Sequence, residues 1–130
     1  MEQGDYNMNA ENIKPKVLTI LLIKGPYVSE AADIALKTAL KAKRKGYAVN
    51  VFLYLDGTWV SHLKDNKSFN NPGDWLKRVI RTGVSVKMCE RCSKARDLNK
   101  DNIVDNILIP GSYEFIELLK QSDKVLTFGG

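Results

Sequence analysis

The sequence predicts a three-layer α/β/α sandwich around a five-stranded, mainly parallel β-sheet. Short runs of apolar, partly β-branched residues alternate with longer segments in which apolar residues recur at helical spacing. The first run, residues 17–23, is nearly continuous in apolar residues, which is typical of a strand buried on both faces. A strand, a helix and a second strand then follow within about forty residues, which is the length of a right-handed βαβ unit.

Length and composition indicate one globular domain. The chain has 130 residues, of which 44% are hydrophobic and 27% charged. We expect residues 17–130 to form a single α/β domain and the polar, Asn-rich residues 1–16 to form a disordered tail. The longest apolar run is too short to cross a bilayer, and the N-terminus lacks the pattern of a secretory signal. We therefore expect a cytoplasmic protein that does not contact membranes.

The first half of the chain reads as strand, helix and strand. After residues 17–23, Gly25 and Pro26 break the strand, and Ser29 is the predicted N-cap of a helix that ends at Gly46. Residues 49–55 form the second strand, after which the chain turns at an Asp-Gly pair. The apolar face of the helix consists of small and branched residues: Ala32, Ala35, Leu36, Ala39 and Leu40.

A long loop separates the second strand from the third. Residues 58–73 are loop-like, and a loop of this length in a compact domain is usually functional or mobile. Asp74 is the predicted N-cap of the next helix, which Gly83 ends. Residues 84–88 alternate between apolar and polar, which predicts a short third strand.

The last third of the chain predicts two more strands. Residues 93–98 should be helical, residues 107–109 should form a fourth strand, and residues 124–128 a fifth. Pro110 and Gly111 precede another helix. Its spacing predicts that Tyr113, Ile116 and Leu119 face the core, with Phe115 and Leu118 beside them.

The chemically active stretch contains both cysteines of the chain, Cys89 and Cys92. Cys89 follows the predicted third strand, at the sheet edge where parallel sheets gather reactive groups. If the next residues are helical, its sulfur lies beside free backbone N–H groups. Nearby charges are mostly positive, with Lys87, Arg91, Lys94 and Arg96 opposed only by Glu90. These influences favour a Cys89 thiolate that attacks sulfur donors and carries a persulfide.

Other interpretations of the cysteine pair stay open. Cys-x-x-Cys is half of a zinc site, but the chain has one histidine, His62, so further ligands would have to come from another subunit. The same spacing serves dithiol redox centres such as that of thioredoxin. The cysteines could also be inert packing residues. We expect no metal and no cofactor.

Three residues near the second strand are candidate pocket residues. The segment that leaves this strand should lie at the same sheet edge as Cys89, so Asp56, Trp59 and His62 are predicted to line a substrate pocket. His62 would be a base if its loop folds over Cys89, and otherwise it is an ordinary surface histidine. Arg91 and Lys94 are predicted to bind the anionic substrate.

The net charge of +5 is compatible with an anionic ligand or an acidic protein partner, or with solubility alone. The chain has no Lys/Arg run of the length of a nucleic-acid arm, and its aromatic residues are not interleaved with basic ones. The sequence therefore does not favour binding of nucleic acid.

Several segments, in the expected order, resemble the DsrE/DsrF-like family, which includes TusD-type sulfurtransferase subunits. The resemblance runs from about residue 16 to the C-terminus. It is carried by Gly25-Pro26-Tyr27, by residues 51–57 with their Asp-Gly turn, by residues 83–89 followed by Ala95-Arg96, and by residues 111–128.

This resemblance implies a function for the cysteine after the third strand. In the family that cysteine accepts sulfane sulfur as a persulfide and passes it to a partner, and the matching position here is Cys89. Cys92 departs from the TusD-type pattern, and its role stays open. The resemblance also implies homotrimers or hexamers that work with a TusA-like sulfur carrier or a rhodanese, with an anionic sulfur donor and no cofactor. The alternatives are a non-catalytic binding or assembly subunit and a dithiol oxidoreductase that uses Cys89 and Cys92.

Overall fold

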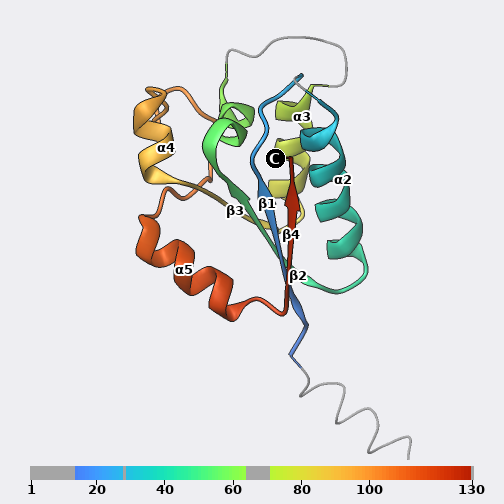
Figure 1. Ribbon diagram of the computed structural model, residues 1–130. Helices are drawn as coiled ribbons and strands as arrows, with labels where there is room; N and C mark the ends of the chain where they lie inside the picture. The colour runs from blue at the N-terminus through green and yellow to red at the C-terminus, as the bar shows by residue number, and fades with distance from the viewer. Residues whose placement is uncertain (1–13, 28, 64–70, 130) are drawn as a thin grey trace, which may run out of the picture.

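The computed structural model describes residues 14–27, 29–63 and 71–129 (Figure 1). The predicted tail therefore lies largely outside the described residues, as does part of the predicted loop 58–73. The elements are β1 (Val17–Leu22), α2 (Ala31–Arg44), β2 (Ala48–Leu53), the 3₁₀ helix η1 (Leu55–Ser61), α3 (Pro72–Arg81), β3 (Ser85–Met88), α4 (Glu90–Ala95), α5 (Ser112–Gln121) and β4 (Lys124–Phe128).

The sheet is parallel, and its strands lie in the order β3-β2-β1-β4. Its register aligns the last residues of three strands, since Leu22 pairs with Leu53 and Leu53 pairs with Met88. The carboxyl ends of β1, β2 and β3 therefore form one edge. The segments that leave these strands, including the one with both cysteines, begin side by side at that edge.

The described sheet has four strands, so the prediction of five is wrong in number. Residues 107–109 were predicted as a strand, but only Leu108 pairs there, in an isolated parallel bridge with Lys87. The bridge rests on the amide of Met88 donating to the carbonyl of Leu108 at 2.8 Å. Asn106 has a left-handed φ of 69° immediately before this segment. Pro110 follows it and lacks an N–H group, so among the described residues its only hydrogen bond to the β3 side is the one that its carbonyl accepts from the amide of Glu90 at 3.2 Å, and no regular strand forms.

Helices flank the sheet on both sides, as the α/β prediction requires. In Figure 1, α2 and α3 cover one face, and α4 and α5 lie on the other. The strand order explains this arrangement. The chain steps from β1 to β2 to β3 in one direction and then returns past β1 to β4, and right-handed crossovers place those two sets of helices on opposite faces. None of the helices in the described ranges is long and apolar enough to cross a membrane.

The core lies mainly between the sheet and helices α2 and α3. Ile20, Leu22, Leu36, Leu53 and Leu76 each expose 0% of their surface. Burying side chains of this size contributes about 1.5–3 kcal/mol each to folding. The carboxyl edge of the sheet therefore rests on a well-packed interior.

The predicted helix ends are partly confirmed. Gly46 and Gly83 follow α2 and α3 with left-handed φ values of 98° and 95°. The predicted cap Asp74 is wrong, because the N-cap of α3 is Asn71, whose side chain accepts from the amide of Gly73 at 2.8 Å. Proline at the first position of α3 explains the earlier start.

Helix α5 is rotated relative to the prediction. Tyr113 and Ile116 are 72% and 54% exposed, so they do not face the core. Phe115 instead packs against Phe52 with ring centroids 4.2 Å apart and the rings tilted by 30°, and Leu118 is buried. Aromatic contact with β2 therefore determines which side of α5 faces the sheet.

Candidate functional site

Cys89 occupies the junction between β3 and α4. It follows the last residue of β3, and its amide donates to the carbonyl of Leu53 in β2 at 3.0 Å. Its backbone is extended, with φ of −61° and ψ of 127°, and its side chain caps α4 by accepting from the amide of Cys92 at 3.4 Å. Helix α4 therefore begins at Glu90, three residues earlier than the predicted 93–98. The Cys89 side chain is partly exposed, and both cysteines are free thiols.

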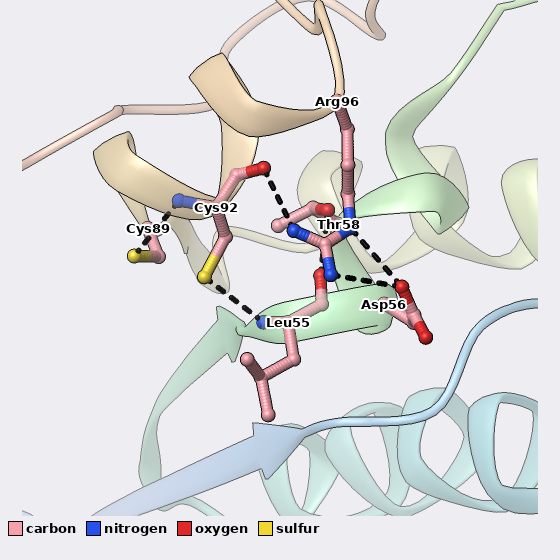
Figure 2. A network of polar contacts seen from close by, with 6 residues as sticks. All are labelled: Leu55, Asp56, Thr58, Cys89, Cys92 and Arg96. Carbon is pink, nitrogen blue, oxygen red and sulfur yellow. Dashed lines mark hydrogen bonds and ion pairs between the residues drawn. The ribbon is translucent and has the colours of Figure 1, made fainter.

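Cys92 lies one turn into α4, and its sulfur points toward the end of β2 (Figure 2). It is 7% exposed, and its Sγ accepts a hydrogen bond from the backbone amide of Leu55 at 3.2 Å. Each sulfur therefore has its own backbone N–H donor. Cys92 supplies one to Cys89, and Leu55 supplies one to Cys92.

The Leu55 donor depends on the turn that η1 makes beyond β2. Leu55 has a left-handed φ of 52°, which is uncommon for a branched residue. Its carbonyl accepts from the hydroxyl of Thr58 at 2.7 Å, and Thr58 is fully buried. Gly57 donates to the carbonyls of Ile23 and Tyr54, both at 2.9 Å, so the turn is fixed against β1.

Arg96 connects α4 to η1. Its Nε and Nη2 donate to Oδ1 of Asp56 at 3.0 and 2.9 Å, and its Nη1 donates to the carbonyl of Cys92 at 3.1 Å (Figure 2). The Arg96 side chain is 22% exposed, whereas that of Asp56 is 64% exposed. One guanidinium therefore joins the segment that carries Cys92 to the turn that holds the Leu55 amide. From the sequence, Arg96 was expected only to be a positive charge near the cysteines, and its contact with Asp56 was not predicted.

Burial raises the pKa of the Cys92 thiol, and its side-chain hydrogen bond with Cys89 raises it further. The Leu55 amide and the charge of Arg96 act in the opposite direction but do not cancel these effects. Cys92 is therefore a protonated thiol at neutral pH.

The raised pKa of Cys92 predicts a pH dependence of stability. The folded state holds the Cys92 proton more strongly than the unfolded chain, so this contribution is complete below the ordinary thiol pKa and is lost as pH rises through the folded pKa. Urea unfolding from pH 7 upward should show the wild type losing stability relative to Cys92→Ala. A stability difference that does not change with pH would contradict this.

The two predicted anion-binding residues, Arg91 and Lys94, lie on the surface of α4. Arg91 is exposed. The Lys94 ammonium pairs with Glu90 at 3.5 Å, and both side chains are well exposed, so solvent weakens this pair. Lys87 is partly buried, which lowers its pKa, and its Nζ donates to Ser85.

The three predicted pocket residues separate into two groups. Asp56 binds Arg96, as described above. Trp59 and His62 pack against each other edge to face with ring centroids 5.7 Å apart, and the His62 backbone bridges to Ile103. Within the described ranges, neither ring is a hydrogen-bond partner of a cysteine sulfur. Those ranges also contain no cluster of three or more His, Cys, Asp or Glu side chains placed to hold a metal.

Two relatives are each described as an uncharacterized protein. A protein of Methanocaldococcus jannaschii described as uncharacterized is 35% identical over 111 residues, covering 85% of this chain and 97% of the relative. A second uncharacterized protein, from Methanopyrus kandleri, is 32% identical over 113 residues, covering 86% and 93%.

Solved structures share the fold. The YchN protein of E. coli superposes with a TM-score of 0.76 at 25% identity, covering 88% of this chain and 100% of that one. A conserved protein of unknown function from Bacteroides thetaiotaomicron superposes with a TM-score of 0.67 at 19% identity, covering 86% and 94%. The DsrE/DsrF-like family itself matches residues 16–128, nearly the whole described chain. The resemblance drawn from the sequence is therefore confirmed, and this protein belongs to the DsrE/DsrF-like family.

Proposed function

We propose that the protein is a sulfur-carrier or sulfurtransferase subunit that accepts sulfane sulfur on Cys89 and passes it to a partner carrier protein. Its family is generally connected with sulfur relay, which is the background for the proposal. The observation that carries it is the unequal pair of cysteines. Cys89 is partly exposed beside a backbone donor, whereas Cys92 is buried behind it and holds its proton.

The transfer needs no net oxidation. The Cys89 thiolate attacks the sulfane sulfur of a persulfide or thiosulfate, the donor's S–S bond breaks, and the donor leaves as a thiolate or as sulfite. A partner thiolate then attacks the outer sulfur and regenerates the Cys89 thiolate. The Cys92 amide, 3.4 Å from the Cys89 sulfur, stabilises the anion before attack and after release. No resident cofactor takes part in these steps.

Partners follow from the chemistry of the site's surroundings. The exposed Arg91, with Lys94 beside it, suits an anionic donor or the acidic surface of a TusA-like carrier or a rhodanese. Asp56, Trp59 and His62 are proposed to border the substrate pocket beside Cys89. Tyr113 and Ile116, one turn apart on α5, are exposed apolar side chains, which supports assembly of copies of this chain into trimers or hexamers.

The test is sulfur loading followed by mass measurement of the intact protein. Wild type, Cys89→Ser and Cys92→Ser are incubated with thiosulfate, tetrathionate or a low-molecular-weight persulfide. We expect the wild type and Cys92→Ser to gain sulfur adducts that a reductant removes, and Cys89→Ser to gain none. Cys92→Ser is the matched control, because it removes the neighbouring thiol in the same motif.

Two other outcomes would replace the proposal. A dithiol oxidoreductase would form a reversible internal disulfide in the wild type, lose it in both variants and never carry an adduct. The placement of both cysteines at the start of α4, with the Cys92 amide 3.4 Å from the Cys89 sulfur, favours this second candidate. A wild type that is inert to every donor would instead indicate a non-catalytic binding or assembly subunit.

A further inference from the structure

A basic groove lies between helices α2 and α3, on the face of the sheet opposite α4. The groove is an open cavity of about 440 Å³, and its lining includes five cationic side chains and one aromatic ring. These groove residues are Lys37, Lys41, Arg44, Arg78, Arg81 and Trp75.

The two helices bring these residues together because of their spacing and direction. Lys37, Lys41 and Arg44 recur every three or four residues along α2, and Arg78 and Arg81 do the same along α3. Both helices return from the carboxyl edge of the sheet to its amino edge, and they pack side by side (Figure 1). The cations therefore form two facing rows, one from the middle to the end of α2 and one in the second half of α3, over a length of about 10 Å.

Among the described residues, most of this charge is not paired with a carboxylate. Lys37 pairs with Asp33 at 2.9 Å. In the part of the chain that the structure describes, no carboxylate pairs with Lys41, Arg44 or Arg81. Basic residues do stabilise the negative end of a helix, but that end carries only about half an elementary charge. Two helix ends therefore account for a small part of the positive charge in the groove.

Trp75 holds two of the cations in place. The Lys37 ammonium lies 4.9 Å from the centroid of its ring, and the Arg78 guanidinium carbon lies 4.6 Å from it. Cation–π contact uses the flat face of a guanidinium and leaves its N–H edge available to acceptors. The groove therefore presents positioned donors in addition to mobile surface charges.

We propose that this groove binds a compact polyphosphate, a chain of a few phosphate groups such as a triphosphate. Phosphate oxygens match both the guanidinium edges and the lysine ammonium groups. The cavity volume is within the range of small-molecule sites, about 300–1,000 Å³. Acidic residues at the start of each helix, Glu30 and Asp33 on α2 and Asp74 on α3, limit the positive surface to a short length. A short polyanion fits this surface better than a long one.

The groove is separate from the cysteine site, so this inference does not depend on the proposed sulfur transfer. The groove could not be predicted from the sequence, because the two sets of cations lie more than thirty residues apart in the chain. Arg78 and Arg81 form no basic run, and the short run Lys43-Arg44-Lys45 contains only one of the groove residues of α2.

The test uses the full chain with inorganic tripolyphosphate as the probe. In a Trp59→Phe background Trp75 is the only tryptophan, so its fluorescence reports directly on the groove. We expect a saturable fluorescence change at about 0.15 M salt, where surface charges more than about 8 Å apart are largely screened. The double variant Arg44→Gln/Arg81→Gln should weaken binding at least tenfold. The control Lys100→Gln/Lys120→Gln removes the same charge from exposed positions outside the groove and should bind as the parent does.

Further ligands identify the source of the phosphates. ATP that binds at least as tightly as tripolyphosphate, and that the Arg44/Arg81 variant also loses, supports the proposal and adds a nucleoside to the ligand. An absence of saturable binding overturns the proposal, as does an equal loss in the control variant. Binding of a single-stranded RNA oligonucleotide at least tenfold tighter than tripolyphosphate also overturns it, because the ligand would then be a polymer.

Discussion

Replacing Gly57 with alanine is expected to destabilise the protein by about 3 kcal/mol, at the upper end of the usual cost of overpacking. A Cβ at this position would lie 2.1 Å from the carbonyl oxygen of Leu22 and 2.8 Å from its carbonyl carbon. That carbonyl belongs to the central strand β1 and already accepts from the amide of Tyr54 at 2.9 Å. Neither backbone segment can yield easily, so η1 has to move away from the sheet. Urea denaturation measures the change.

The same substitution should act on Cys92. Displacing η1 uncovers the Cys92 side chain, which is 7% exposed, so this gain in access should accelerate alkylation of Cys92 in a Cys89→Ser background. The matched control is Gly46→Ala, which meets no atom within 4 Å but has a φ of 98°. That variant should cost about 1–2 kcal/mol for the left-handed backbone alone and leave Cys92 alkylation unchanged. If the two variants lose the same free energy of unfolding, the contact of Gly57 with β1 is not tight.

Replacing Arg96 with glutamine is expected to cost about 1–2 kcal/mol of stability and to expose Cys92 to alkylation several times faster. The charged hydrogen bonds to Asp56 and to the Cys92 carbonyl are lost together, although the exposure of Asp56 moderates their value. A double-mutant cycle with Asp56→Asn should give a coupling energy of about 1 kcal/mol. The measurements are urea denaturation and the rate of Cys92 alkylation.

The control for this prediction is the neighbouring ion pair on α4. Lys94→Gln removes a pairing with Glu90 between two well-exposed side chains, so its effect should stay within about 0.5 kcal/mol. If Arg96→Gln changes stability but leaves the Cys92 alkylation rate unaltered, the Arg96–Asp56 ion pair supports the fold without positioning Cys92.

Most of the fold was predicted from short sequence patterns, namely apolar runs, apolar–polar alternation and glycines at helix ends. The apolar run at residues 17–23 and the alternation at 84–88 correspond to β1 and β3, and the glycines that follow α2 and α3 end those helices. The same reasoning misassigned residues 107–109, since a short apolar run does not reveal that its neighbours prevent pairing. The side of α5 that faces the sheet was also mistaken, because Phe52 on a distant strand determines it.

Only those parts of the candidate site that depend on residues adjacent in the sequence could be predicted. Cys89 could be placed at the carboxyl edge of the sheet because it directly follows a strand. The contact between Arg96 and Asp56 joins residues 40 positions apart, and no spacing rule reveals it. The donor to Cys92 is a backbone amide, so the identity of Leu55 gives no sign of it.

The backbone amide of Leu55 cannot be removed by replacing its side chain, which affects how mutational data on this site are interpreted. Every residue type except proline supplies the same N–H group at position 55, so an alanine there keeps the donor to Cys92. An alanine scan would therefore classify Leu55 as dispensable while leaving the interaction itself intact. Replacing the Leu55 amide with an ester, which deletes the N–H and keeps the side chain, is the substitution that would reveal it.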